Sequence, residues 1–587
     1  MRLPLRRYWR LLARYLLPQS RALLLLAALL LGGIAMELVA PQLLRTFLDR
    51  AQDSEPLRAL YATAALFIGV TTLAQLAAVV ETYIAETVGW IATNRLRADL
   101  AEHCLHLDLA FHHARTPGEL IERIDGDVTS LANFFSRFTV AIVGNALLLL
   151  GVLALLWRED WRIGLGVGLF ALATLTAMLR LYTAAQPRWA AVSQESALFY
   201  GFVGERLTGA EDIRTSGASA VAQTLHRFAE RIRRWRGLLL RAVFMGQAVW
   251  MAALSLLALA NALALLIAAR QVLSGGATIG TVYLIATYTT LLMRPIGRLQ
   301  AEIQDLQQAG ASIGRIEALF AARSAIQDGP GVPLPTGPLA VELANVSFTY
   351  GDGPPALRTV DLNIPAGTTL GLLGRTGSGK TTLARLLPRL YDPTAGVVCL
   401  GGVDVRQAQL SDLRSRIGLV PQEVQLLAAS VRDNLTFGDP AIPDDRLRDA
   451  IAALGLRPWF DALPAGLDTP LAPGGGLSAG EAQLLAFVRV FLKNPGLVIL
   501  DEASSRLDPV TERLLAGAID RLLRGRTAII IAHHLATIRR VDAIAILEAG
   551  AIIEYGPREA LSRDETSRFS RLLRLAADDR RDLEELL

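Results

Sequence analysis

Six long apolar runs in the first half of the chain constrain its fold more than any other feature. Each run is close to the roughly 20 residues that an α-helix needs to cross the hydrocarbon core of a bilayer. Hydrophobic residues make up 52% of the chain and charged residues 19%, with a mean hydropathy of +0.37, which is too apolar for a wholly soluble protein. The sequence therefore predicts an all-α membrane domain of six helices. The runs cover residues 22–40, 59–80, 138–157, 161–182, 243–269 and 279–293.

Charge fixes the expected orientation of these helices. Arginines cluster ahead of the first run, so the positive-inside rule predicts a cytosolic N-terminus, and six spans return the chain to the cytosol. The first run is longer than a signal peptide's apolar segment and has no clear cleavage site, so we expect it to be retained. The loops at 94–136 and 186–240 are long and show helical spacing of apolar residues, so we expect the spans to continue into the cytosol.

The second half of the chain has a different composition. Residues 326–340 are rich in Pro and Gly and read as a linker. Short β-branched runs then alternate with helical segments, which is typical of an α/β domain with a largely parallel sheet. We predict a membrane domain at 1–325, the linker at 326–340, the α/β domain at 341–575 and a charged tail at 576–587.

The totals also exclude some classes of protein. The net charge is only +4, so charge gives no reason to expect a nucleic-acid partner. The two cysteines, Cys104 and Cys399, fall in segments predicted to be cytosolic, so no disulfide framework is expected.

The segment GRTGSGKT, Gly374 to Thr381, matches the phosphate-loop pattern G-x-x-x-x-G-K-[ST] between a strand-like and a helix-like run. Glycines let backbone N–H groups surround phosphate oxygens at a helix N-terminus. Lys380, one of only two lysines in the chain, reaches the β and γ phosphates as a compact charge, a role that arginine's planar group does not fit. The predicted phosphate-binding residues are Gly374, Arg375, Thr376, Gly377, Ser378, Gly379, Lys380, Thr381 and Thr382.

The segment LVILDE, Leu497 to Glu502, reads as a buried strand that ends in two carboxylates. Asp501 is predicted to hold Mg²⁺, together with the Thr381 hydroxyl, and Glu502 to polarise the water that attacks the γ phosphate of ATP. A strand end of this kind is common by itself, and it gains meaning only beside a phosphate loop.

With these motifs in hand, the chain resembles the ATP-binding cassette (ABC) family. The segment LSAGE, Leu477 to Glu481, is similar to the family's LSGGQ signature, and six spans ahead of one cassette is the layout of ABC exporters. The resemblance assigns further roles. Adenine stacks on Tyr350, Gln422 links Mg²⁺ to the membrane domain, Ser478, Gly480 and Glu481 belong to the signature, Asp508 to the loop that crosses the dimer, and His533 contacts the γ phosphate.

The resemblance implies a half-transporter that hydrolyses ATP with Mg²⁺ and completes its sites only with a second half-transporter. Coupling helices are expected near 111–119 and 209–215. The expected setting is the cytoplasmic (inner) membrane of a prokaryote, and the expected cargo is a small molecule, a lipid or a peptide. Three alternatives stay open: an importer built on the exporter fold, an ATP-gated channel or regulator, and a membrane-tethered ATPase that serves a soluble partner.

The signature departs from the family pattern. Ala479 replaces a glycine and Glu481 replaces the glutamine, and a carboxylate near bound phosphate could weaken the site. Altered signatures occur in one chain of heterodimeric exporters, so a heterodimer is favoured over a homodimer. Glu481 could also point away from the nucleotide and only pack.

Other candidates have simpler interpretations. The histidines His103, His106, His112 and His113 with Cys104 show no spacing that forces them to converge on a metal, so a packed or solvated helix face is favoured. Carboxylates in or near the spans are candidates for a substrate pathway or for helix pairing. The basic run 227–241 is expected at the inner interface, against anionic headgroups. The pathway candidates are Glu37, Glu81 and Glu86.

Overall fold

The structure is a computed structural model that describes residues 13–133, 139–292, 310, 312–471, 477–501, 509–532 and 538–579. It divides into two compact units. We call the first the helical unit (residues 1–105 and 116–322) and the second the sheet unit (106–115 and 323–587). The division falls between Ala322 and Arg323, and it assigns residues 106–115, part of the first predicted cytosolic loop, to the sheet unit.

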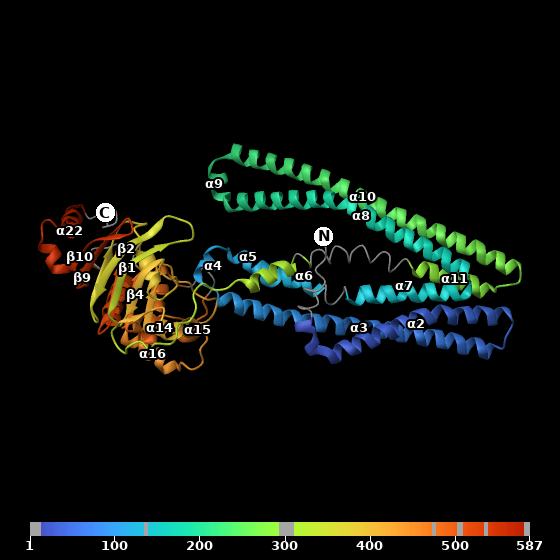
Figure 1. The fold of residues 1–587 in the computed structure, drawn as a ribbon, viewed down its shortest axis with the longest axis horizontal. Coiled ribbons are helices and arrows are strands. Elements are labelled where there is room, and N and C mark those ends of the chain that lie inside the picture. The colour runs from blue at the N-terminus through green and yellow to red at the C-terminus, as the bar shows by residue number, and fades with distance from the viewer. Residues whose placement is uncertain are drawn as a thin grey trace. The chain divides into compact units, whose positions relative to one another are not determined.

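The helical unit consists of long helices joined by short connections (Figure 1). Each predicted apolar run lies in a different helix, namely α2, α3, α7, α8, α10 and α11 in chain order. The elements are η1 (Leu17–Gln19), α2 (Ser20–Gln52), α3 (Leu57–Leu105), α5 (Pro117–Ile121), η2 (Glu122–Gly126), α6 (Asp127–Asn133), α7 (Thr139–Glu159), α8 (Trp161–Thr208), α9 (Ala210–Thr215), α10 (Ala218–Leu273) and α11 (Ile279–Leu291).

Three stretches of the described residues are long and apolar enough to cross a membrane: 13–52, 57–105 and 254–273. Shorter apolar helices cover 161–177 and 279–291. At 1.5 Å per residue, the 56 residues of α10 extend about 84 Å, well beyond the roughly 30 Å of a hydrocarbon core. This helix is therefore long enough to continue past any membrane that it crosses.

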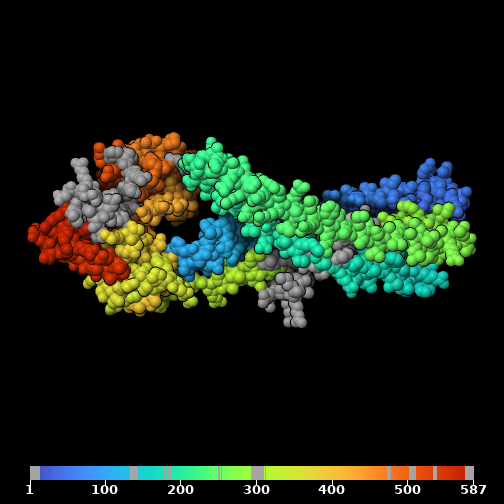
Figure 2. All heavy atoms as spheres, turned by 90° about the horizontal axis from the view of Figure 1, so that it is seen from above, coloured from blue at the N-terminus to red at the C-terminus, as the bar shows by residue number. Residues whose placement is uncertain are grey.

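The helices of this unit carry apolar side chains both on the exposed surface and in the buried core. Leu66, Ile68 and Leu73 of α3 are exposed, as expected for side chains that face lipid tails. Inside the unit, α7, α8, α10 and α11 share a core that includes Val152, and the buried Tyr288 donates a hydrogen bond to the carbonyl oxygen of Leu38 at 2.7 Å. In the space-filling view, the green side chains of α10 are exposed along one face of the helical unit (Figure 2).

The sheet unit contains two sheets. A four-stranded antiparallel sheet has the order β2-β1-β4-β5, and a six-stranded sheet has the order β10-β9-β3-β8-β7-β6, in which β10 alone is antiparallel. The strands are β1 (Val341–Thr349), β2 (Pro355–Ile364), β3 (Thr369–Leu373), β4 (Ala395–Leu400), β5 (Val403–Asp404), β6 (Ile417–Val420), β7 (Leu497–Asp501), β8 (Thr527–Ile531), β9 (Ala543–Glu548) and β10 (Ala551–Pro557).

The six-stranded sheet is covered on both faces, which explains its continuous apolar runs. Along β7, Val498 and Leu500 belong to one hydrophobic core while Leu497 and Ile499 belong to another, because successive side chains of a strand point to opposite faces. The helices of this unit are α4 (Leu109–His113), α13 (Lys380–Leu386), α14 (Leu410–Arg416), α15 (Val431–Thr436), α16 (Asp444–Ala453), α17 (Arg457–Asp461), η4 (Gly466–Asp468), α18 (Ala479–Lys493), α19 (Pro509–Leu523), α21 (Arg558–Arg563) and α22 (Arg568–Asp579).

A membrane-type helical region followed by an α/β unit with a mostly parallel sheet is the fold class that the sequence predicts, and the structure confirms it. The predicted coupling segments contain α4 and α5 near 111–119, and α9 at Ala210–Thr215. Within the sheet unit, Leu109 of α4 packs against the hydrophobic core, and Asp108 caps α4 and also accepts a hydrogen bond from the Ala325 amide at 2.6 Å.

Candidate nucleotide-binding site

The predicted phosphate loop connects β3 to α13, so it lies at the carboxyl edge of the parallel strands, where open α/β sheets bind ligands. Two of its glycines are required by the backbone. Gly374 has φ = 154° and Gly379 has φ = 109°, both in the region that favours glycine. A Cβ on Gly379 would lie 2.7 Å from the Ala356 carbonyl oxygen, so no other residue fits without a shift of the chain.

Lys380 begins α13 and is only 6% exposed. Its ammonium group donates hydrogen bonds to the carbonyl oxygens of Gly374 and, at 3.1 Å, of Arg375. The lysine therefore stabilises the backbone at the start of the loop, at Gly374 and Arg375. Among the described residues the buried Ser378 hydroxyl has no hydrogen-bond partner, so it can serve a phosphate oxygen.

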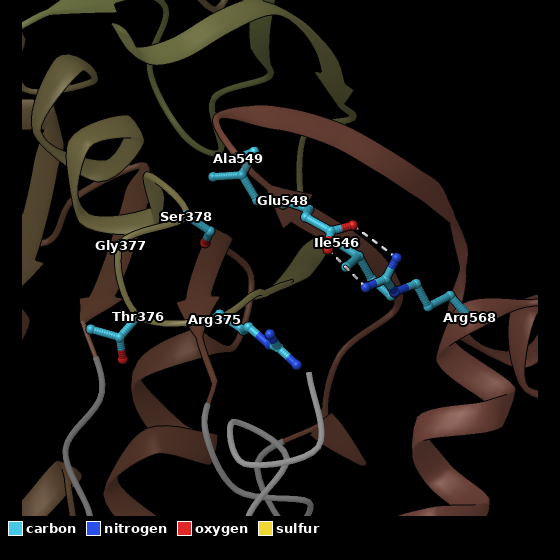
Figure 3. A pocket seen from close by; sticks show the side chains of 9 residues that line it. Arg375, Thr376, Gly377, Ser378, Ile546, Glu548, Ala549 and Arg568 are labelled. Carbon is cyan, nitrogen blue, oxygen red and sulfur yellow. Dashed lines mark hydrogen bonds and ion pairs between the residues drawn. The ribbon is translucent and has the colours of Figure 1, made fainter. Parts of the chain in front are cut away.

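A pocket of about 150 Å³ lies against the first half of the loop (Figure 3). Arg375 to Ser378 line one side, and the end of β9 with the start of α22 lines the other. Arg568 of α22 forms a two-bond ion pair with Glu548, at 2.8 and 3.0 Å. Two arginines and one glutamate among the lining residues leave this flank of the loop electropositive, which favours phosphate oxygens.

Tyr350 follows β1 and is held by two other aromatic rings. Its ring meets Phe348 edge to face at a centroid distance of 4.7 Å and Tyr391 at 5.2 Å. Its hydroxyl group donates to the Thr382 hydroxyl at 3.1 Å, which ties the ring to α13. The side chain remains 38% exposed, so the ring can still stack on a base.

The predicted Mg²⁺ ligands all follow parallel strands. Thr381 comes after β3, Asp501 ends β7, and the exposed Gln422 comes two residues after β6, so all three lie on the carboxyl edge of the same sheet. A hydroxyl, a carboxylate and an amide oxygen form the hard oxygen set that Mg²⁺ prefers, and the residues therefore fit the ion. Three further predicted residues, Glu502, Asp508 and His533, lie outside the described residues.

Ser478 is the N-cap of α18 and forms a capping box with Glu481. The Ser478 amide donates to the Glu481 carboxylate at 2.8 Å, and the Glu481 amide donates to the Ser478 hydroxyl at 3.3 Å. Ser478 is exposed, whereas Gly480 is buried in the first turn. Glu481 thus has a local structural role, because its carboxylate satisfies an amide at the start of the helix.

Two residues that the sequence did not indicate contact the loop that follows Gln422. Asn434 of α15 and Arg489 of α18 connect the loop after Gln422 to the helix that begins at the signature. Neither residue belongs to a motif, and 55 residues separate them, so no local pattern could reveal their contact.

One histidine of the cluster, His103, binds the backbone. Its Nε2 lies 3.0 Å from the Leu319 carbonyl oxygen and 3.1 Å from that of Ala322, where the helix at residues 312–321 ends. Across the described part of the chain, no three His, Cys, Asp or Glu side chains are grouped closely enough to hold a metal ion.

An α/β unit with this phosphate loop, in one chain with a unit of membrane-length helices, defines an ATP-powered membrane transporter. Two family models match the chain: "ABC transporter" over residues 357–505 and "ABC transporter transmembrane region" over residues 22–296. The chain belongs to the ABC transporter family.

Its relatives match from end to end. An "ATP-dependent lipid A-core flippase" of Thiobacillus denitrificans is 33% identical over 94% of this chain and 95% of the relative. A protein of the same name from Ralstonia nicotianae is 31% identical over 94% and 93%. The "uncharacterized ABC transporter ATP-binding protein YknV" of Bacillus subtilis is 29% identical over 94% and 92%.

A solved structure shares the fold. The structure of a bacterial Atm1-family ABC exporter with ATP bound superposes with a TM-score of 0.79 at 24% identity, over 95% of this chain and 98% of that one. The chain is therefore an exporter-type half-transporter that binds ATP and couples it to transport across a membrane.

Proposed function

We propose that the chain is one half of a lipid exporter, which uses ATP to move an amphipathic lipid across the cytoplasmic membrane. The observation that carries this proposal is the end-to-end similarity to relatives named lipid A-core flippases, at 33% and 31% identity. Lipid A-core is accordingly the first substrate to test. Exposed apolar side chains along α3 support a helical unit embedded in lipid.

The proposed ATP site uses the residues predicted from the sequence. Tyr350 stacks on adenine, the loop from Gly374 to Thr382 surrounds the phosphates, and Lys380 neutralises their charge. Thr381, Gln422 and Asp501 would hold Mg²⁺, which supplies positive charge at the β and γ phosphate oxygens.

The catalytic roles belong to two residues beyond the described part. Glu502 orients and polarises the attacking water, and His533 contacts the γ phosphate. Asp508 belongs to the loop that crosses to the partner.

The dimer is part of the proposal, because the resemblance to ABC exporters implies that each ATP lies between the phosphate loop of one chain and the signature of the other. In this chain the phosphate loop precedes α13, and the signature lies at the N-terminus of α18. The altered signature keeps a different second half-transporter as the predicted partner, with a homodimer as the alternative. The capping box weakens one reason for preferring the heterodimer, because it gives Glu481 a role that does not depend on a partner.

The orientation remains the one predicted from charge, with the N-terminus and the ATP-binding unit in the cytosol. If the chain exports lipid, then lipid placed in the leaflet on the ATP side should move to the other leaflet. If it imports lipid, movement should run in the opposite direction.

The test is ATP hydrolysis and lipid movement in proteoliposomes, measured with the purified chain alone and again together with a second half-transporter. Lipid A-core should stimulate ATPase activity and move between leaflets only with ATP, whereas phosphatidylethanolamine should not stimulate. Lys380→Ala is the matched control and should abolish both activities. Stimulation equal for both lipids would contradict the proposed substrate. Full stimulated turnover by the chain alone would reject the heterodimer.

A further inference from the structure

The loop that follows Gln422 is bonded directly to the helix that carries the signature. The link consists of Asn434 on α15 and Arg489 on α18, and neither side chain is among the predicted nucleotide contacts. Asn434 is buried and Arg489 is half-buried in the sheet unit, and polar groups in such places need hydrogen-bond partners.

Asn434 is fully buried, with 0% exposure, and its amide is completely used. Its Nδ2 donates to the carbonyl oxygens of Leu427 at 2.9 Å and Ser430 at 3.0 Å. Its Oδ1 accepts from the Leu427 amide at 2.8 Å and from Arg489 Nη2 at 3.0 Å. Two donors and two acceptor positions are all that an Asn side chain offers, so the loop has one defined conformation on this side chain.

Arg489 binds Asn434 on α15 and, with one longer bond, the loop itself. Its Nε donates to the Asn434 carbonyl oxygen at 2.6 Å, and its Nη1 donates to the Gln425 carbonyl oxygen at 3.4 Å. Its guanidinium lies 4.6 Å from the centre of the Phe437 ring. Arg489 follows Ser478 by 11 residues, about three helical turns, so the two lie on the same side of α18.

A backbone bridge strengthens the connection. The Val431 amide donates to the Thr469 carbonyl oxygen, and the Leu471 amide donates to the Ala429 carbonyl oxygen, both at 3.0 Å. Residues 469–471 come before the signature in the chain, and here they are bonded to the end of the loop and to the start of α15. Arg432 pairs with Asp444 at 2.7 Å and fixes α15 on its outer side.

We propose that Asn434 and Arg489 are positioning residues that make the loop after Gln422 and the signature helix move as one body. A displacement of the loop, caused by nucleotide or by the membrane helices, then displaces Ser478 by a similar amount. Without the link, the loop responds and the signature does not. This inference rests on the proposed roles of Gln422 and Ser478 at the two halves of the ATP site.

Arg489→Lys is the main test variant, because lysine keeps the charge but cannot make the three diverging hydrogen bonds. Asn434→Ala tests the other partner, and the double variant tests whether the two act as one link. Arg446→Ala is the matched control, since Arg446 also binds α18, at the Leu492 carbonyl oxygen at 3.0 Å. Thermal midpoints measured for every variant separate loss of the link from loss of folding.

The measurement is amide hydrogen exchange of the full-length chain in lipid nanodiscs, with and without ATP. In the wild type and in Arg446→Ala, ATP should slow exchange in the loop at 423–430 and in the first turn of α18 together. In Arg489→Lys and Asn434→Ala, the loop should still respond while the first turn of α18 loses its response. Correlated protection that survives in both folded variants would overturn the inference, and so would its loss in Arg446→Ala.

The ATPase assay gives a second, kinetic test. Stimulation by lipid A-core should fall about fivefold in either single variant with little change in the KM for ATP, and the double variant should match the singles. A rise in KM with unchanged stimulation would contradict the inference. If the wild type shows no lipid stimulation, the proposed substrate fails, and the exchange measurement still decides the link.

Discussion

Replacing Glu481 with glutamine should weaken the fold and strengthen the nucleotide site at the same time. Glutamine restores the residue usual in the family signature and keeps an oxygen for the Ser478 amide, now 2.8 Å from the carboxylate. The substitution removes only the negative charge. That charge contributes to the capping box at the start of α18 and opposes the phosphate of any ATP that Ser478 contacts.

The size of the stability effect follows from the contacts. A hydrogen bond to a charged group contributes about 1 kcal/mol more than a neutral one. A negative charge in the first turn of a helix adds about 0.3–1 kcal/mol. The sum, about 1–2 kcal/mol, corresponds to a fall of about 2–8 °C in the thermal midpoint of a unit of this size.

The assay pairs thermal unfolding with ATPase kinetics on the same purified preparations. Glu481→Gln should unfold at a lower temperature and show a lower KM for ATP. Glu481→Ala is the control, since it loses the charge and the capping acceptor and should unfold at a still lower temperature. An unchanged midpoint in both variants would refute the capping role. A higher KM in Glu481→Gln would refute the idea that the charge opposes the nucleotide.

Three other perturbations give separate tests. Tyr350→Ala should raise the KM for ATP about 5- to 150-fold through lost base stacking, whereas Tyr350→Phe loses only the bond to Thr382 and should change it less than about twofold; equal effects would contradict stacking. Lys380→Arg should reduce turnover by about 100-fold or more, because a planar guanidinium is larger than the buried ammonium group and presents its hydrogen bonds differently, and near-normal turnover would show that charge alone suffices. The pKa of Asp404 lies below its ordinary value of 3.8, because burial raises this pKa but hydrogen bonds from Arg406 lower it by more. The ionised carboxylate therefore stabilises the fold above pH 3.8, and this contribution is lost as the pH falls below that value. Asp404→Asn should therefore lower the thermal midpoint at pH 7 and approach the wild type in acid, and a difference that is constant with pH would contradict the ion pair.

Much of the fold can be predicted because its signals are local. A run of about 20 apolar residues in lipid must satisfy its own backbone hydrogen bonds, so it forms a helix, and all six runs lie in helices. The glycines of the phosphate loop are equally informative, since Gly374 and Gly379 adopt conformations that other residues avoid. The parallel sheet follows from buried strands such as β3 and β8, which are covered on both faces.

The capping box can be predicted from the sequence. Ser478 and Glu481 have the S-x-x-E spacing of a helix N-terminus, but the same residues also match the signature, which indicates phosphate binding. The link between Asn434 and Arg489 cannot be predicted from the sequence, because it joins residues far apart in the chain and depends on how α15 packs on α18. The grouping of residues 106–115 with the sheet unit likewise depends on tertiary contacts, such as that of Leu109 with the core.

The most direct test of the account is lipid movement driven by ATP in sealed proteoliposomes that contain the chain together with its second half-transporter. The wild type should transfer fluorescent lipid A-core between leaflets when ATP and Mg²⁺ are supplied on the side of the ATP-binding unit. Glu502→Gln should bind ATP but transfer no lipid beyond the first turnover. Transfer at the same rate without ATP, or sustained transfer by Glu502→Gln, would contradict the claim that ATP hydrolysis at this site powers transport.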